Sequence, residues 1–317
     1  MRFRYPMEKQ EKKMRMEESK NSTPSGSDPF VKLLILTLFL FGGALSKAQP
    51  FDSINHKKLN RLIIGTSVGY TLAMVSLSEV WYSDFDKQSF RFFNDSKEWY
   101  QMDKLGHFYG AYQISNASSN ALRKTGIPKK QAQKIGALAS FAMMSSIEIF
   151  DGYSSGYGAS ASDLLANATG TAFYLGQQWL WDETRIYPKF SFHTTYLAHQ
   201  RPSVLGSNFS EKLLKDYNGQ TYWLSIDMDR FITFPKWINI AIGHGAHDFI
   251  YASKGANLAT GYNPYRQYYL SLDFDLTAIP TQSKALKSLI YIVNMIKLPS
   301  PTLEFSNNGL KAYAFYF

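Results

Sequence analysis

Two short stretches of the chain concentrate side chains that bind cations or transfer protons. The first, QMDKLGHFYGAYQISN (101–116), places Asp103 and His107 four residues apart, and so on one helix face, with Lys104 on the same turn. The second, IEIFDGYSSGYGASASDLLANATG (147–170), adds four more polar residues: Glu148, Asp151, Asp163 and Asn167. One imidazole beside several carboxylates suffices for acid–base chemistry, but the same groups also hold metal ions or neutralise one another.

Three interpretations of these residues follow. In the first they form a structural polar cluster, because buried charges are tolerated when they are paired and hydrogen-bonded; its members would be Asp103, Lys104, His107, Glu148, Asp151, Ser160, Asp163 and Asn167. In the second, His107 and a carboxylate from the same set bind a divalent cation. In the third they hydrolyse a substrate, and the catalytic candidates are His107, Glu148, Asp151 and Asp163. We expect the structural cluster. Because no ligand motif such as His-Glu-x-x-His occurs, the sequence predicts neither a metal nor a cofactor.

The elements that must position these side chains are helical. Apolar spacing predicts helices over 62–77, 103–122, 129–150 and 162–181. The first is free of charges and rich in Gly, Ser and Thr, which favours tight packing. Ser160 or Ser162 is expected to cap the fourth. In an up-down bundle the start of the second helix, the end of the third and the start of the fourth meet at one end, so the polar residues should converge there.

From about residue 185 the hydrophobic period changes from helical to twofold. Strands are predicted around 222–229, 237–245, 268–276, 302–308 and 310–317, with one helix, 283–298, inserted before the last two. Asn307-Asn308-Gly309 predicts a short hairpin. The expected fold class is α+β, a small-residue-rich four-helix bundle followed by an antiparallel β region. Five or six strands are fewer than the eight at which outer-membrane barrels begin, so we expect a curved sheet packed on the helices.

The N-terminal part is typical of an exported protein. Residues 31–45 form an apolar run too short for a comfortable membrane span, and Ser46-Lys47-Ala48 matches a cleavage site. We expect a leader with a signal peptide (1–48), a helical domain (55–184) and a β-rich region (185–317), with an uncleaved anchor as the alternative. Without the leader the net charge falls from +9 to +5 and no basic run is present, so no nucleic-acid partner is expected. The absence of cysteine excludes disulfides and thiolate metal sites.

The combined motifs resemble those of the YfiM-like family, bacterial envelope proteins catalogued as domain of unknown function 2279. The matching pieces are Asp103-Lys104-x-x-His107, Glu148-x-x-Asp151-Gly152, Gly158-x-Ser160-x-x-Asp163 and Asn167-x-x-Gly170. They cover about residues 95–181, and a more distant similarity runs to VanZ-like proteins. The remainder looks like the extended members common in Bacteroidota. Unlike the short lipoproteins of the family, this chain lacks the lipid-bearing cysteine. The resemblance implies a site without an established reaction.

The leader and the resemblance together indicate an exported protein of the periplasm, associated with the outer membrane. We expect a non-catalytic, periplasm-facing subunit or partner of an outer-membrane protein complex, or a protein of the membrane surface. A type IX secretion translocon is one candidate assembly. The alternative is an envelope hydrolase that acts on lipid or cell-wall material at the cluster of His107, Glu148 and Asp163.

Overall fold

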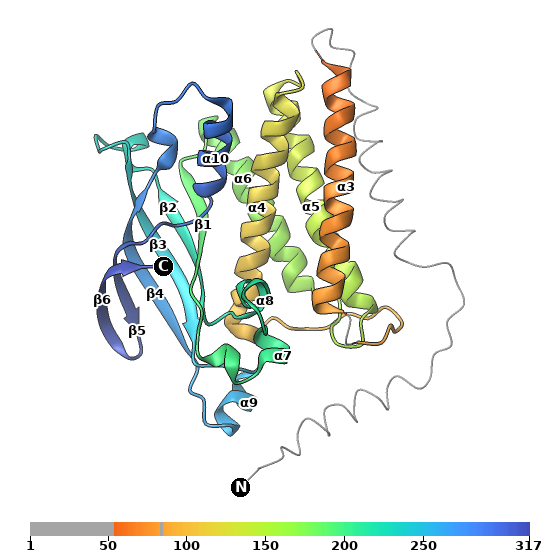
Figure 1. Ribbon diagram of the computed structural model, residues 1–317, viewed down its shortest axis with the longest axis vertical. Helices are drawn as coiled ribbons and strands as arrows, with labels where there is room; N and C mark the ends of the chain where they lie inside the picture. The colour runs from red at the N-terminus through yellow and green to blue at the C-terminus, as the bar shows by residue number, and fades with distance from the viewer. Residues whose placement is uncertain (1–53, 83–84) are drawn as a thin grey trace.

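The computed structural model describes residues 54–82 and 85–317, in which a group of long helices stands beside one antiparallel sheet (Figure 1). The expected leader and its cleavage site lie outside the described residues. The α+β class is confirmed, since long helices make up the first half and the six described strands all follow residue 185.

The long helices are α3 (His56–Trp81), α4 (Met102–Arg123), α5 (Lys129–Tyr153) and α6 (Ala161–Trp181), and the last three carry the polar motifs. A 3-10 turn, η1 (Glu98–Gln101), leads into α4. Ser160 caps α6, because its hydroxyl accepts the Asp163 backbone N–H at 3.0 Å. This bond satisfies one of the donors that every helix start leaves free.

Small residues allow α4, α5 and α6 to approach closely. A Cβ on Gly170 of α6 would collide with the backbone carbonyl of Phe108 in α4. A Cβ on Gly136 of α5 would likewise collide with Ser119 of α4. Because backbone atoms are among these neighbours, they cannot move aside cheaply. The glycine that ends the Asn167-x-x-Gly170 motif is therefore a packing requirement of the contact between α4 and α6.

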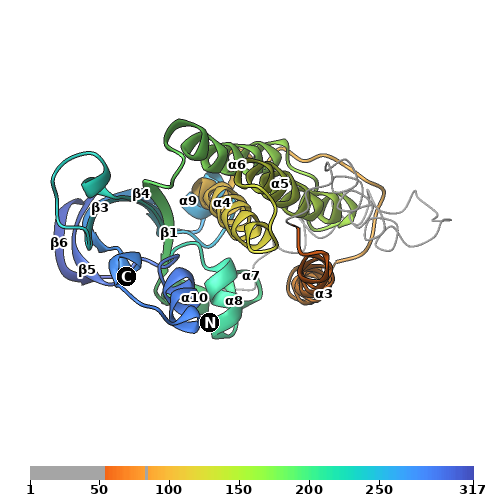
Figure 2. The same cartoon turned by 90° about the horizontal axis from the view of Figure 1, so that it is seen from above.

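The tight packing expected for the first helix is wrong. α3 lies beside the other long helices (Figure 2), but Ile64 and Leu72 are 64% and 62% exposed. A Cβ on Gly65 or Gly69 would meet no atom of the described chain, so these glycines serve no close approach there. By length and composition, His56–Glu79 and Lys129–Tyr153 are apolar enough to cross a membrane. That criterion is weak evidence, because core helices and signal sequences also satisfy it.

The sheet is an antiparallel meander in which each strand pairs with its neighbours in the sequence. Its strands are β1 (Ile186–Phe192), β2 (Gln220–Ile226), β3 (Ile238–His247), β4 (Tyr265–Phe274), β5 (Ser300–Ser306) and β6 (Gly309–Tyr316). The hairpin predicted at Asn307-Asn308-Gly309 joins β5 to β6, and Gly309 adopts a φ of +98° there. A left-handed residue in a tight turn favours glycine, because glycine has no Cβ to clash.

The sheet is strongly curved (Figure 2), and polar side chains fill its concave side. Thr221 Oγ1 of β2 lies 3.2 Å from the Tyr316 hydroxyl of β6, although three strands lie between β2 and β6. The β1 side is closed by residues 295–297, since the Phe190 backbone bonds to Met295 and Lys297. The interior of the curved sheet is therefore built from Trp223, tyrosines, hydroxyls and paired charges.

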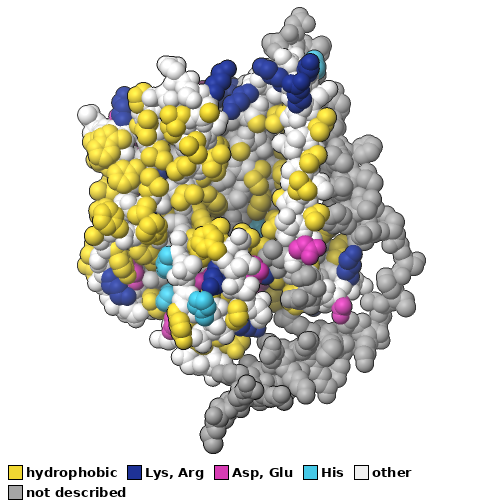
Figure 3. Space-filling view, viewed as in Figure 1, with side chains coloured by type: hydrophobic (Ala, Val, Ile, Leu, Met, Phe, Trp, Pro, Cys, Tyr) yellow, Lys and Arg dark blue, Asp and Glu magenta, His cyan; other side chains and the backbone are white. Residues whose placement is uncertain are grey.

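The convex side of the sheet carries the apolar side chains. On β1 and β2 this side packs on α4, where Phe190 and Tyr222 contact the ring of Tyr109. On β3–β6 it is exposed and forms what we call the apolar sheet face: Ile242, Tyr268, Leu270, Leu272, Leu303, Phe305, Leu310 and Phe315. Figure 3 shows hydrophobic side chains gathered over the strands. The alternation predicted from the sequence is present, but the polar face is the buried one.

Two differences from the expected elements have local causes. α10 (Lys284–Val293) lies between β4 and β5, and is shorter than the predicted 283–298 because residues 295–297 bond to β1 instead. The loops hold short helices that lack a helical hydrophobic period: η2 (Leu197–His199), α7 (Pro202–Leu205), α8 (Phe209–Lys215), η3 (Met228–Arg230), α9 (Lys254–Ala259) and η4 (Leu276–Ala278).

Candidate functional site

The polar residues singled out from the sequence meet where α4 and α6 begin and α5 ends. α4 contributes Asp103, Lys104 and His107 from its first two turns. α5 contributes Glu148 from its last turns, and α6 contributes Asp163 and Asn167. The antiparallel course of the three helices brings these ends together.

Lys104 joins carboxylates from three segments of the chain. Its Nζ lies 2.6 Å from Asp95, 2.7 Å from Asp103 and 3.0 Å from Asp163. Asp95 precedes η1 and also accepts hydrogen bonds from the Ser160 and Ser162 hydroxyls that begin α6, at 2.6 and 2.8 Å. The sequence interpretation missed Asp95, because a loop Asn-Asp-Ser gives no sign of which distant groups its carboxylate contacts.

His107 links the other members of the cluster. Its Nδ1 lies 3.0 Å from Oδ1 of Asn167, and its Nε2 lies 3.6 Å from Oε1 of Glu148. The second oxygen of Glu148, Oε2, accepts the Ser160 backbone N–H at 2.9 Å. Glu148 therefore ties the end of α5 to the start of α6.

Burial dominates the electrostatics of this site. Glu148 is 2% exposed, and burial, reinforced by the charges of Asp163 and Asp151, raises its pKa to about 9. Burial also raises the pKa of Asp103 to about 7, against the opposing charge of Lys104. Burial disfavours the charge of Lys104, but Asp103 and Asp163 outweigh it and raise the lysine pKa. The site therefore holds more negative groups than its one ammonium can balance.

Asp151 was predicted to belong to the polar cluster, but its hydrogen bond is to a residue outside that cluster. Its Oδ1 accepts the hydroxyl of Tyr82 at 2.8 Å, where Tyr82 ends α3. Burial raises the pKa of Asp151 to about 7, which the Tyr82 hydrogen bond opposes. Tyr82 was also missed from the sequence, because no spacing relates the end of α3 to the end of α5. This bond connects the end of α3 to the end of α5.

Two groups of ligand atoms lie close enough to surround one cation. His107, Glu148 and Asp163 each offer an atom within 4.8 Å of the others, and so do Asp95, Asp103 and Asp163. Lys104 already contacts all three carboxylates of the second group. The cluster can therefore pair charges, exchange protons between His107 and carboxylates, or hold a cation at the first group.

The start of α4 is held by the sheet. Trp99, Tyr100 and Gln101 have φ values of 47°, 55° and 63°, a left-handed conformation that costs energy for residues other than glycine. Arg266 of β4 fixes this segment, since its guanidinium donates to the Tyr100 carbonyl at 2.9 Å and to the Gln101 side chain. Met102, which follows, is fully buried against Ala246 and Phe249.

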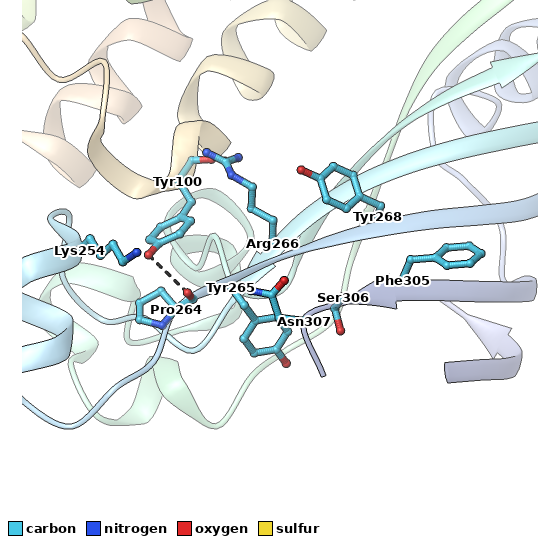
Figure 4. Close-up of a pocket in the computed structure, with 9 residues that line it drawn as sticks. All are labelled: Tyr100, Lys254, Pro264, Tyr265, Arg266, Tyr268, Phe305, Ser306 and Asn307. Atoms are coloured by element: carbon cyan, nitrogen blue, oxygen red, sulfur yellow. Dashed lines mark hydrogen bonds between the residues drawn. The ribbon is translucent and has the colours of Figure 1, made fainter. Parts of the chain in front are cut away.

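A separate pocket of about 440 Å³ lies at this junction (Figure 4). Its walls come from η1, α9, β4 and the β5–β6 hairpin: Tyr100, Lys254, Pro264, Tyr265, Arg266, Tyr268, Phe305, Ser306 and Asn307. Lys254 and Arg266 form no ion pair with a carboxylate in the described part of the chain. This pocket suits an anionic group and contains no residue of the polar cluster.

Comparison with known proteins identifies the segment that carries the cluster. Residues 89–176 match the model of a family described as "Predicted periplasmic lipoprotein (DUF2279)". The match includes α4, α5 and most of α6, and none of the sheet. No curated protein and no solved structure matches the chain. The resemblance to domain of unknown function 2279 is confirmed, and it supports an exported, periplasmic protein; the VanZ-like similarity stays a prediction.

Proposed function

We propose, from the premise that residues 89–176 belong to this family of periplasmic proteins, that the protein is a non-catalytic component of the bacterial outer envelope. In this role it associates with the outer membrane through its sheet, while the helices face the periplasm. The polarity of the sheet is the observation that carries the proposal.

The apolar sheet face is built as lipid-contacting sheets are. Its outward residues are apolar, whereas buried residues of the same strands are polar, such as Ser271, Asp273 and Glu304. Membrane-facing strands show this arrangement of apolar-out and polar-in positions. Tyr268 and Phe305 lie opposite each other, as do Leu270 and Leu303, so the apolar side chains form continuous rows across β4 and β5.

The edge of this face supports contact with lipid. Tyr268 and Phe305 lead into the pocket of Figure 4, where the cationic side chains of Lys254 and Arg266 lie. An apolar surface that ends in cations and tyrosines matches the boundary between acyl chains and anionic headgroups.

A structural role for the polar cluster supports the non-catalytic assignment. Lys104 links α4 to Asp95, Glu148 links α5 to the start of α6, and His107 links α4 to α6, so the cluster fixes the helices relative to one another. The alternative, an envelope hydrolase at His107, Glu148 and Asp163, draws on the same buried carboxylates, one of which has a pKa of about 9 and so holds a proton at neutral pH. The two roles differ in the response of Glu148 to substitution.

Membrane association is tested with paired charges on the apolar sheet face. Leu270→Asp with Leu303→Asp should abolish flotation of the protein with vesicles of anionic phospholipid and its retention in outer-membrane fractions. Leu165→Asp, at a residue 64% exposed on α6, is the matched control and should float as the unaltered protein does. Equal flotation of all three proteins would overturn the proposal. Affinity purification from membranes then identifies the partner assembly, with a type IX translocon as one candidate.

A further inference from the structure

His107 and Glu148 face each other with an acceptor on each side. Nδ1 of His107 lies 3.0 Å from Asn167 Oδ1, an oxygen that only accepts, so the proton of the neutral ring belongs on Nδ1. Nε2 then presents its lone pair to Oε1 of Glu148 at 3.6 Å. Two acceptors do not attract each other, so this pair needs either a proton on Glu148 or a cation between the two atoms.

The free oxygen of Glu148 points to the same conclusion. Oε1 is buried and has no hydrogen-bond partner in the described residues, whereas Oε2 is held by the Ser160 backbone. A buried, unpaired carboxylate oxygen is costly. A hydrogen bond between Nε2 and Oε1 would draw the two atoms to about 2.8 Å. The observed 3.6 Å is close to the separation of roughly 3.4 Å between two ligands of a tetrahedral ion with bonds of about 2.1 Å.

Asp163 completes the set from a third helix. Its ligand atom lies within 4.8 Å of those of His107 and Glu148, so the three atoms are close enough to surround one ion. Lys104 contacts Asp163 at 3.0 Å but does not take the place of that ion, because Oε1 of Glu148 still has no hydrogen-bond partner in the described residues. Its ammonium is one positive charge among the carboxyl groups gathered here, and a divalent cation would add the positive charge that lets more of these groups ionise together.

We propose that His107 Nε2, Glu148 Oε1 and Asp163 bind one divalent transition-metal ion, Zn²⁺ or Mn²⁺, which cross-links α4, α5 and α6. One imidazole with two carboxylates suits these ions. Asn167 orients the imidazole through its other nitrogen, as the outer partners of metal ligands do. The sequence alone predicts no metal, because the ligands lie on three helices and form no contiguous motif. This inference does not depend on association with the membrane.

The test is a titration of the purified, chelator-treated protein with ZnCl₂, MnCl₂ and, as a reference, MgCl₂. Calorimetry should give one equivalent of bound Zn²⁺ or Mn²⁺, and the melting temperature should rise. His107→Gln and Glu148→Gln should each weaken binding at least tenfold. Asp151→Asn is the matched control, because Asp151 lies three residues from Glu148 but bonds to Tyr82; it should bind within about twofold of the unaltered protein.

A measurement on the unaltered protein removes any dependence on the folding of variants. Pulsed EPR of the Mn²⁺-loaded protein should show coupling to one imidazole nitrogen. Absence of binding by Zn²⁺ and Mn²⁺ would overturn the proposal. So would a bound ion without nitrogen coupling, or binding that survives both glutamine substitutions.

Discussion

Lys189 of β1 and Asp273 of β4 form a buried ion pair with 2.6 Å between Nζ and Oδ2, although β2 and β3 lie between their strands. Only a curved sheet allows this contact. Neighbouring strands of a sheet lie about 4.8 Å apart, and in a flat sheet β1 and β4 would be separated by three such spacings. The pair also receives a hydrogen bond from Ser225 of β2, whose hydroxyl lies 2.6 Å from Asp273. The interior of the sheet is thus held by charge and hydroxyl contacts.

Removing one partner of this pair should be far worse than removing both. Asp273→Asn leaves the Lys189 ammonium buried without its counter-charge and should lower the free energy of unfolding by about 3–5 kcal/mol. The double variant Lys189→Met with Asp273→Leu should lose less, because both charges of the pair are removed together and only the weaker support that Asp273 gives to the buried Lys297 is lost. Urea denaturation of the three proteins measures this. Equal losses in the single and double variants would show that the pair does not fix the curvature.

Gly170→Ala should destabilise the helical part of the protein. The added Cβ would collide with the Phe108 carbonyl, which is backbone and cannot rotate away. Overpacking of this kind costs about 1–3 kcal/mol. Gly176→Ala is the control, since a Cβ there meets no neighbouring atom, and alanine is the better helix former. Melting temperatures should therefore fall for the first variant and rise or stay constant for the second.

His244 should make the protein less stable in mild acid. Burial and the neighbouring Arg266 lower the pKa of His244 from 6.5 to about 4. Between these values the unfolded chain binds the proton and the folded chain does not, so stability falls as the pH drops from 6.5 towards 4. His244→Gln keeps an acceptor for the Arg266 N–H but cannot titrate in this range. Its unfolding free energy should depend less on pH, and parallel curves for the two proteins would contradict the assignment.

Substitutions of Glu148 distinguish a structural role of the polar cluster from a hydrolytic one. With chelator present, Glu148→Gln should change stability little, because an oxygen for the Ser160 N–H survives. Glu148→Ala leaves that buried donor unpaired and should cost about 1–3 kcal/mol. A general acid or base would be lost in both variants, so hydrolysis would require both to lose function at nearly constant melting temperature. A stable His107→Ala protein that has lost only its function would also support the hydrolase.

The sequence predicted that Lys104, Glu148 and Asp163 meet. Short connections make successive helices antiparallel, so the start of one helix lies beside the end of the next. It did not predict Asp95 or Tyr82, since the partner of a loop or helix-end side chain depends on the folded path. The alternation around Leu270 correctly indicated a strand with two unlike faces. Which face is buried could not be read from it, because burial depends on the curvature that brings Lys189 to Asp273.

The contacts of Arg266 connect the sheet directly to the helix that carries part of the polar cluster. Its guanidinium donates hydrogen bonds to Tyr100 and Gln101, directly before α4. The first two turns of that helix carry Lys104 and His107. The residues before α4 are in the left-handed conformation, which few other backbone arrangements can replace at low cost. A displacement of β4 would therefore also move the start of α4, and would change the separation between His107 on α4 and Glu148 on α5.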